Sequence, residues 1–311
     1  GPNAMVQRIT ELKKSEKGAR AAIQLIADLT GDGVMGDSVL EGNEEAITAS
    51  DQIIQIDQIR HANRLAGRMA DQKSIIGFRE ASRDVLGYFL ADRIDQMAFL
   101  ALSGVAFTSK CNGAVRPVLG AGLNLSNLAF AADVSAPTAN RYKNWDSGTG
   151  KLITANTATI DATDLPSYKM LVQMKAFAKD QYLRGIKGPG GQEYYHVFMS
   201  PQGSAALKQD ADYLANVRNA GVRGDDNTLF TGAVANVDGL VIHEFRYVYN
   251  TAGLASASKW GTGGLIDGQK VLLCGAQALA FADLGVPYWE EEIYDYGNSF
   301  GISIGKILGM K

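Results

Sequence analysis

The sequence predicts an α+β fold in which a long hairpin and a long helix precede a series of shorter elements. Two observations carry this prediction. Apolar and β-branched runs flank a turn-rich stretch near the N-terminus, and a helical repeat of apolar residues follows over about 70–102. Strand and helix signals do not alternate regularly after that point, so a parallel α/β sheet is not expected.

The hairpin is predicted from two extended runs. Residues 21–29 are apolar and end at the turn signal of residues 30–33. The returning strand is expected over 51–59, where β-branched isoleucines favour extended backbone. The two strands together predict a long hairpin with a wide tip.

Charge is distributed unevenly along the chain. Residues 1–20 carry five basic and two acidic side chains, residues 21–59 carry eight carboxylates and no Lys or Arg, and residues 60–93 carry seven bases and four acids. The formal net charge is only −3, so the chain lacks the positive surplus of a dedicated nucleic-acid binding protein. The pattern predicts a basic N-terminal segment, an acidic hairpin tip and a basic-leaning helix.

The helix predicted over about 70–102 has an amphipathic repeat and a stop signal at Gly104. At 1.5 Å per residue it would be about 50 Å long, which indicates a structural spine. Its predicted buried stripe contains Ile75, Phe78, Ser82, Val85, Phe89, Ile94, Met97 and Ala101.

Shorter elements are expected in the rest of the chain. Residues 105–160 are rich in Gly, Asn, Ser and Thr, and no regular element is assigned there. The other predictions are helices over 165–183 and 202–213, and strands over 194–199, 240–249, 271–273 and 294–308.

The composition limits the possible classes of protein. With 46% apolar and 20% charged residues, the chain is expected to fold around a substantial core. No run approaches 18 apolar residues, so no membrane span is expected. Two cysteines are too few for a disulfide framework or a zinc site, and the 35 glycines indicate many turns. The N-terminus does not begin with Met and has no signal-peptide pattern, which suggests a tag remnant or a missing leader.

One motif offers an enzymatic alternative. Gly31, Gly33 and Gly36 match the G-x-G-x-x-G pattern of dinucleotide-binding sites, which would make the protein a nucleotide-binding enzyme. The segment that follows is acidic, which is unfavourable for a phosphate, and no further βαβ units follow. We therefore keep this function as an alternative and not as the main prediction.

The remaining chemically active residues form no recognisable constellation. Residues 28–33 resemble the start of an EF-hand loop, but position 12 is Val39 and not the required glutamate. The acidic run 290–292 is expected to be solvated or to face an interface. His61, His196 and His243 show neither metal nor triad spacing. His196 and His243 lie in strand-like runs, where a hydrogen-bonded core or surface imidazole is expected. We expect no catalytic residue, no metal and no cofactor.

An ordered set of runs resembles the major capsid proteins of tailed bacteriophages, specifically the phage N4-type family with the Hong Kong 97-like fold. The runs are 36–45, 56–60, 78–86, 102–104, 275–280 and 296–302. The resemblance implies the following division: an N-terminal arm (1–17), an E-loop hairpin (18–66), a peripheral domain (67–125 and 276–311, with the spine helix at about 70–102) and an axial domain (126–275).

The resemblance also implies a function. The protein would be a non-catalytic structural subunit that self-assembles into hexamers and pentamers of an icosahedral head, assembled in the host bacterial cytoplasm and located in the virion capsid. Its implied partners are copies of itself, scaffold, portal and cement or decoration proteins, and double-stranded DNA held by confinement, with no membrane. A tail or sheath component, also structural, is a further alternative.

Charge complementarity suggests how neighbouring subunits would meet. In the family's fold the hairpin lies over a neighbour's peripheral domain, so an acidic tip would face a basic surface. We expect Glu41, Glu44 or Glu45 to pair with an arginine of the neighbour, the alternative being that both charge sets are solvated. The acidic candidates are Asp37, Glu41, Glu44, Glu45 and Asp51, and the basic candidates are Arg60, Arg64, Arg68, Arg79 and Arg83.

Overall fold

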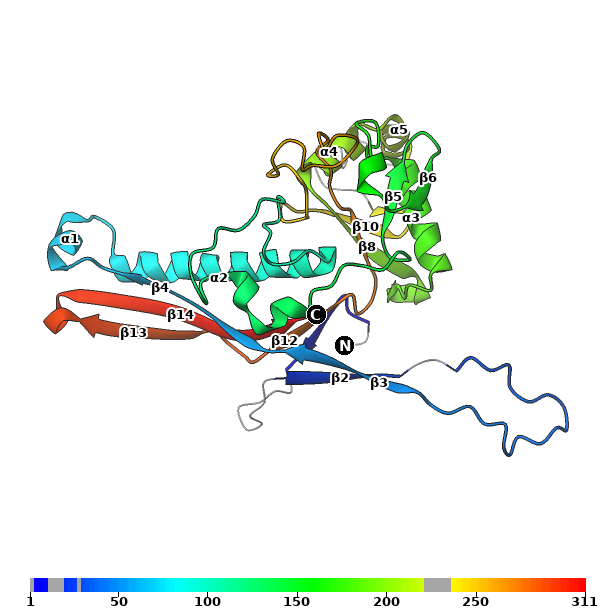
Figure 1. Cartoon of the computed structure of the whole chain (residues 1–311), viewed down its shortest axis with the longest axis horizontal. Coiled ribbons are helices and arrows are strands. Elements are labelled where there is room, and N and C mark those ends of the chain that lie inside the picture. The colour runs from blue at the N-terminus through cyan, green and yellow to red at the C-terminus, as the bar shows by residue number, and fades with distance from the viewer. Residues whose placement is uncertain (1–2, 11–19, 27–28, 221–235) are drawn as a thin grey trace.

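The fold combines two β-sheets, one long helix and one projecting hairpin (Figure 1). The structure is a computed structural model that describes residues 3–10, 20–26, 29–220 and 236–311. Most of the basic N-terminal segment predicted from the sequence lies outside these residues, including Lys13, Lys14 and Lys17, and so does Asp28.

The first sheet is built around its last strand, β14 (Ser299–Met310). β4 (Asp57–Arg64) pairs antiparallel with one edge of β14, and β12 (Leu279–Asp283) and β13 (Tyr288–Tyr294) pair antiparallel with the other. β1 (Val6–Ile9) adds to β12 in parallel. The closing strand predicted at 294–308 is therefore confirmed, but it begins later because a turn occupies its first residues.

The long helix is interrupted near its start, contrary to the prediction of one helix over 70–102. α1 (Arg68–Lys73) is separated from α2 (Phe78–Ser103) by four non-helical residues. In this break the Ser74 hydroxyl accepts a hydrogen bond from Ile76 N at 3.2 Å, which competes with helical bonding. Two β-branched isoleucines and Gly77 follow, and these residue types are weak helix formers. The helix ends as predicted at Gly104, whose φ of 61° forms a left-handed cap.

The buried face of α2 also differs from the predicted stripe. Ile75 is fully exposed and lies outside the helix, and Val85 is 61% exposed. The helix packs against β14 and β4. Over its first turns the buried apolar residues are Leu86 and Leu90, each one position after the predicted Val85 and Phe89. Its buried residues are Ser82, Leu86, Leu90, Met97, Leu100 and Ser103. Apolar residues occur on both faces of this helix, so spacing alone did not identify the buried one.

The second sheet has β8 (Glu193–Met199) at its centre, parallel to β10 (Leu240–Glu244) and antiparallel to β11 (Leu272–Cys274). β9 (Asn236–Val237) pairs with β10, and β7 (Ile186–Lys187) pairs with β8. The helices of this part of the chain are α3 (Tyr168–Asp180), α4 (Pro201–Gln209), α5 (Ala211–Ala220) and the short η4 (Pro189–Gly191). A second core forms here around Tyr195, Val197 and Leu240.

Capping residues explain where these helices begin. The Ser167 hydroxyl accepts a hydrogen bond from Met170 N, and the Ser200 hydroxyl accepts one from Gly203 N. The helix predicted over 202–213 is two helices, because the Asp210 carboxylate accepts from Tyr213 N and from Tyr168 N at the junction. The strand predicted over 240–249 ends at Glu244.

The segment 105–160, for which no element was predicted, contains short elements. They are η1 (Leu125–Asn127), η2 (Ala129–Asp133), β5 (Lys143–Asp146), β6 (Lys151–Thr154) and η3 (Thr157–Thr159). β5 and β6 form an antiparallel hairpin. A further short turn, η5 (Asp295–Gly297), connects β13 to β14.

The predicted hairpin is confirmed as β2 (Arg20–Ile26) paired antiparallel with β3 (Ala49–Gln55). Its base packs on the first sheet through the fully buried Ile54, which belongs to a small core with Ala282. At Gly309 a Cβ atom would lie 2.3 Å from the carbonyl oxygen of Gln55, so only glycine lets β3 cross this close to β14. The base of the hairpin is thus fixed, while the loop 29–48 projects beyond it (Figure 1).

Candidate functional site

The acidic loop 29–48 lies at one end of the elongated molecule, and α1 with the β13–β14 turn lies at the other (Figure 1). Three of the predicted acidic residues, Asp37, Glu41 and Glu44, are exposed on this loop, and Asp51 is exposed on β3. No helix or strand occurs within 29–48. One copy of the chain therefore presents its carboxylates far from its own α1.

Glu45 has a different role, because it closes the neck of its own loop. Its carboxylate accepts hydrogen bonds from Thr30 N at 2.8 Å, Thr30 Oγ1 at 2.9 Å and Gly31 N at 2.7 Å. The backbone N–H groups of Thr30 and Gly31, together with the Thr30 hydroxyl, hold the pKa of the Glu45 carboxyl below its usual value. Glu45 thus joins the two sides of the loop within one chain.

Replacing Glu45 with glutamine is expected to loosen this neck. The amide side chain keeps one acceptor oxygen but loses the charge that strengthens the bonds to Thr30 and Gly31. We expect several-fold faster backbone amide exchange at these two residues, measured at pH 7. The matched change Glu41→Gln, at an exposed residue of the same loop, should leave that exchange unchanged. Equal exchange in both variants would show that the carboxylate does not hold the neck.

The loop also exposes a set of large apolar side chains, which the charge pattern did not reveal. Their exposed fractions are about two thirds, as for Met35 at 69% and Ile47 at 73%. The set is Leu29, Met35, Val39, Leu40 and Ile47. Exposed apolar side chains gathered on one projecting loop indicate a surface that another protein covers.

Two of the predicted basic residues have partners in their own chain. Arg79 Nε lies 2.9 Å from Glu291 Oε1, so the acidic run 290–292 contacts the start of α2. Arg83 pairs with its neighbour Asp84 at 3.3 Å in an exposed position. Both pairs are open to solvent and are expected to be weak, so the arginines stay available to a partner.

Two of the other basic candidates, Arg64 and Arg68, lie beside the β13–β14 turn. Arg64 donates to Ser299 Oγ at 2.9 Å and its guanidinium lies 4.3 Å from the centre of the Tyr294 ring. Arg68 donates to the Gly297 carbonyl at 3.0 Å. Arg60 is exposed on β4. The structure therefore places all five predicted arginines on β4, α1 and the start of α2.

A groove of about 270 Å³ lies between the end of β4 and the start of α2. Apolar side chains line much of it, including Leu65, Ile76 and Phe78, and Val85 lies at its margin. Met69 and Ile75 nearby are 68% and 103% exposed. This end of the molecule thus combines exposed apolar surface with arginines and with carboxylates such as Asp71, Glu80 and Glu291.

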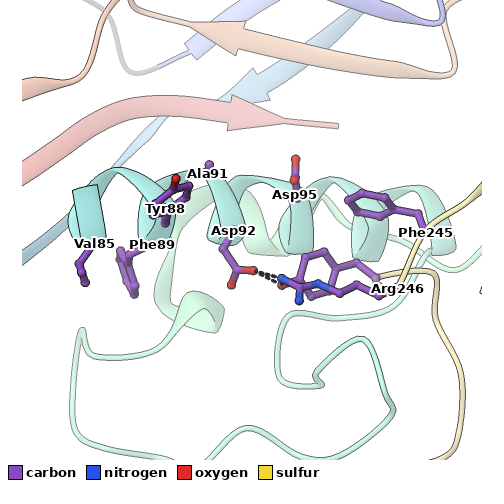
Figure 2. Close-up of a pocket in the computed structure, with 9 residues that line it drawn as sticks. Val85, Tyr88, Phe89, Ala91, Asp92, Asp95, Phe245 and Arg246 are labelled. Carbon is purple, nitrogen blue, oxygen red and sulfur yellow. Dashed lines mark hydrogen bonds and ion pairs between the residues drawn. The ribbon is translucent and has the colours of Figure 1, made fainter. Parts of the chain in front are cut away.

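A larger open groove of about 670 Å³ lies along the middle of α2 (Figure 2). Val85, Phe89 and Asp92 line it from the helix, and Phe245 and Arg246 line it from the segment after β10. Arg246 Nη2 donates to Asp92 Oδ1 at 3.2 Å, which joins the two sides. Asp92 is held in this ion pair, and the groove is open and largely apolar. The geometry of the groove is therefore better suited to packing against another surface than to catalysis.

The nucleotide-binding alternative is wrong for this loop. Gly31, Gly33 and Gly36 lie in the projecting loop, and the residues after them return as β3 and do not form the helix that a dinucleotide site requires. The EF-hand resemblance lacks its structural context as well, because strands flank residues 29–48. Within the described ranges, no group of three or more His, Cys, Asp or Glu side chains is placed to hold a metal ion.

Two of the three histidines are hydrogen-bonded to each other, a pairing that the sequence did not predict. His196 Nδ1 and His243 Nε2 lie 2.9 Å apart on neighbouring strands of the second sheet. Nearly fifty residues separate them in the sequence, so only the pairing of β8 with β10 brings them together. His61 lies elsewhere and stacks on Phe89 of α2 at 4.2 Å between ring centroids.

None of the described helices is long and apolar enough to cross a lipid bilayer.

Comparisons of this chain with known proteins agree with one another. A family model described as phage capsid protein matches residues 1–311. The major capsid protein of Pseudomonas phage KPP25 is 57% identical over 309 residues, which cover 99% of this chain and 81% of that protein.

Two solved structures resemble the whole chain. The capsid of Ralstonia phage GP4 superposes with a TM-score of 0.80 at 25% identity, covering 100% of this chain and 83% of that chain. The capsid asymmetric unit of the cyanophage Pam1 gives a TM-score of 0.77 at 20% identity, covering 100% and 85%.

Proposed function

Since this chain belongs to the phage capsid protein family, we propose that it is the subunit from which an icosahedral phage head is assembled, through hexamers and pentamers. The observation that supports this assembly most directly is that the loop 29–48 and α1, whose surfaces we propose to be complementary, lie at opposite ends of one chain (Figure 1). Different surfaces that meet head to tail generate closed rings when the rotation between copies closes. Hexamers and pentamers are rings of this kind.

The fold agrees with this function. The Hong Kong 97-like fold expected from the sequence is confirmed by the structural neighbours, which are phage capsid proteins. We assign residues 1–17 to an N-terminal arm, 18–66 to the E-loop hairpin, 67–125 with 276–311 to a peripheral domain, and 126–275 to an axial domain. The separate core around β8 supports the last of these assignments.

Docking of the loop onto a neighbour would use both charge and apolar contact. An exposed ion pair contributes about 0–1 kcal/mol, so pairs between Asp37, Glu41 or Glu44 and the arginines set register more than affinity. Apolar burial contributes about 25 cal/mol per Å², and the exposed side chains of the loop supply such area. The groove beside Ile76, next to Arg79 at the start of α2, is the surface that we assign to receive them.

The further partners follow from the role of a shell. The packaged double-stranded DNA is confined by the wall and needs no strong basic surface, in agreement with the net charge of −3. The same proposal includes scaffold, portal and cement or decoration proteins as partners. It also includes assembly in the host bacterial cytoplasm, membership of the N4-type subgroup and the lack of any enzymatic activity.

Assembly of the purified chain tests the proposal. We expect sedimentation in the megadalton range and closed shells, or rings of six and five subunits, in negative-stain images. Tubes would favour the tail or sheath alternative. A chain that stays monomeric under all assembly conditions, with no rings and no shells, would contradict the proposal.

A further inference from the structure

The two neighbouring histidines form a hydrogen-bonded pair on one face of the second sheet. β8 and β10 run parallel, with Val241 opposite His196 and His243 opposite Phe198. The imidazole centroids are 5.1 Å apart, and the contact between His196 Nδ1 and His243 Nε2 is 2.9 Å. At this distance one nitrogen donates and the other accepts, so the pair can carry at most one positive charge. A second proton would place a hydrogen on both nitrogens of the contact.

A continuous run of aromatic rings connects this pair to α2. His243 stacks on Phe198 with centroids 5.0 Å apart, and Phe198 meets Phe99 of α2 edge to face at 5.4 Å. Phe99 in turn stacks on Phe245 at 4.8 Å. We call Phe99, Phe198 and Phe245 the aromatic seam. Aromatic contacts of this kind depend on ring geometry, so a displacement of His243 disturbs the seam.

The seam joins α2 to the second sheet. α2 contributes Met97 and Leu100 to the core of the first sheet, and β8 contributes Val197 and Met199 to the core of the second sheet. Phe99 lies on α2 between Met97 and Leu100. Any change at the seam therefore acts on the junction between the two sheets.

The strands beside the pair do not neutralise added charge. On β11, Cys274 lies in register with His196, and burial raises the pKa of its thiol to about 12, so it remains uncharged. On β10, Glu244 forms an ion pair with Lys208 of α4 at 3.5 Å. Among the described residues, neither imidazole has a hydrogen-bond partner other than the second ring.

The groups on α2 and after β10 give little compensation either. Arg246 is paired with Asp92 at 3.2 Å. Burial, and to a smaller extent Asp92, raise the pKa of the Asp95 carboxyl, which favours its neutral form as the pH falls. Glu193 at the start of β8 is exposed. A second positive charge on the histidine pair would thus lack a dedicated counter-ion.

We propose that the His196–His243 pair is an acid-sensitive joint that holds the second sheet against α2 near neutral pH and releases it when the second proton binds. Protonation replaces the nitrogen–nitrogen hydrogen bond with repulsion between two imidazolium ions, and the rings separate. Because His243 stacks on Phe198, this separation loosens the aromatic seam and frees the second sheet to turn relative to α2. The inference does not depend on how neighbouring copies dock.

The direction of the titration supports this joint. Burial, and then the neighbouring His243, lower the pKa of His196 below the usual histidine value of about 6.5. The folded form therefore binds this proton less readily than the unfolded form does. The resulting stability is fully present above pH 6.5 and is lost as the pH falls from there toward the lowered pKa of His196.

Exchange of the histidine C2 hydrogen, followed by mass spectrometry, measures the titration of each imidazole in the full assembled protein. The chain has only three histidines, so each can be followed in its own peptide. We expect the His196 midpoint to lie below 6.5 and to rise in the variant His243→Gln. In this variant the Gln side-chain amide can occupy the position of His243 Nε2, and it does not become protonated. The control His61→Gln should leave the His196 midpoint unchanged.

Backbone amide exchange tests the consequence for the seam. Between pH 7.5 and pH 5.5, after correction for intrinsic rates, we expect several-fold loss of protection around Phe99, Phe198 and Phe245 in the parent chain and in His61→Gln. His243→Gln should keep its protection. An unshifted His196 midpoint, or the same loss of protection in His243→Gln as in the parent, would overturn the proposal.

Discussion

Reversing two charges on the projecting loop is expected to abolish shell assembly. The double variant Glu41→Lys/Glu44→Lys places positive charge opposite the arginines of β4 and α2, and like charges brought together across an interface cost several kcal/mol. Since about 1.4 kcal/mol changes an equilibrium tenfold, the protein concentration needed for assembly should rise by more than about tenfold. Light scattering and negative-stain imaging measure this directly.

The complementary change should restore assembly. Arg79→Glu/Arg83→Glu reverses two charges at the start of α2, beside the proposed receiving groove, and each double variant alone should fail where the combination of both succeeds. Asp180→Lys, an exposed charge reversal on α3, is the control and should assemble normally. Glu41 and Glu44 are exposed, so the thermal stability of the unassembled subunit should not change. Normal assembly of Glu41→Lys/Glu44→Lys would exclude charge as the basis of docking.

The second large effect is expected at Asp283, which joins three strands of the first sheet. Its carboxylate, only 3% exposed, lies 2.6 Å from Arg8 of β1 and 3.0 Å from Lys306 of β14. Asp283→Asn leaves the buried Lys306 ammonium, 12% exposed, without its counter-charge. Removing one partner of a buried pair costs about 3–5 kcal/mol, and we expect the lower part of this range because water reaches Arg8. Thermal unfolding of the unassembled subunit, followed by tryptophan fluorescence, measures the loss.

The same site gives a pH dependence of known sign. Burial alone would raise the pKa of Asp283, but hydrogen bonds from Lys306, Gly285 and Arg8 outweigh it and hold the pKa below the usual value. The stability from this group is therefore present above about pH 3.9 and is lost as the pH falls through the lowered pKa. Asp283→Asn should lack this acid loss. The control Arg8→Gln, at a side chain 61% exposed, should cost about 1 kcal/mol; an equal cost in both variants would contradict the argument.

Much of the fold could be predicted because local signals agreed with the tertiary structure. The hairpin of β2 and β3, the stop at Gly104 and the strand β8 all followed from short patterns whose cause is local. The break before α2 could not be found from apolar spacing, since Ile75 continues the repeat but is exposed. It depends instead on the hydrogen bond between the Ser74 hydroxyl and Ile76 N, which spacing does not encode.

The candidate site was predicted in part. Charge counting identified the acidic loop and the arginines, because charge is a property of composition. It did not reveal that Glu45 closes its own loop, since that role needs Thr30 and Gly31 to lie beside it in space. The histidine pair was missed for the same reason: the pairing of β8 with β10 is non-local, and no sequence spacing indicates it.

The central position of β14 has a consequence for the order of folding. The first sheet needs residues 299–310, because β4, β12 and β13 each pair with β14, and Gly309 lies under β3 at the base of the hairpin. Contacts between such distant parts of a chain form slowly. A chain still emerging from the ribosome lacks this strand, so it cannot hold its hairpin in place. We therefore expect a product that ends before β14 to lack a fixed hairpin and to be unable to join its neighbours.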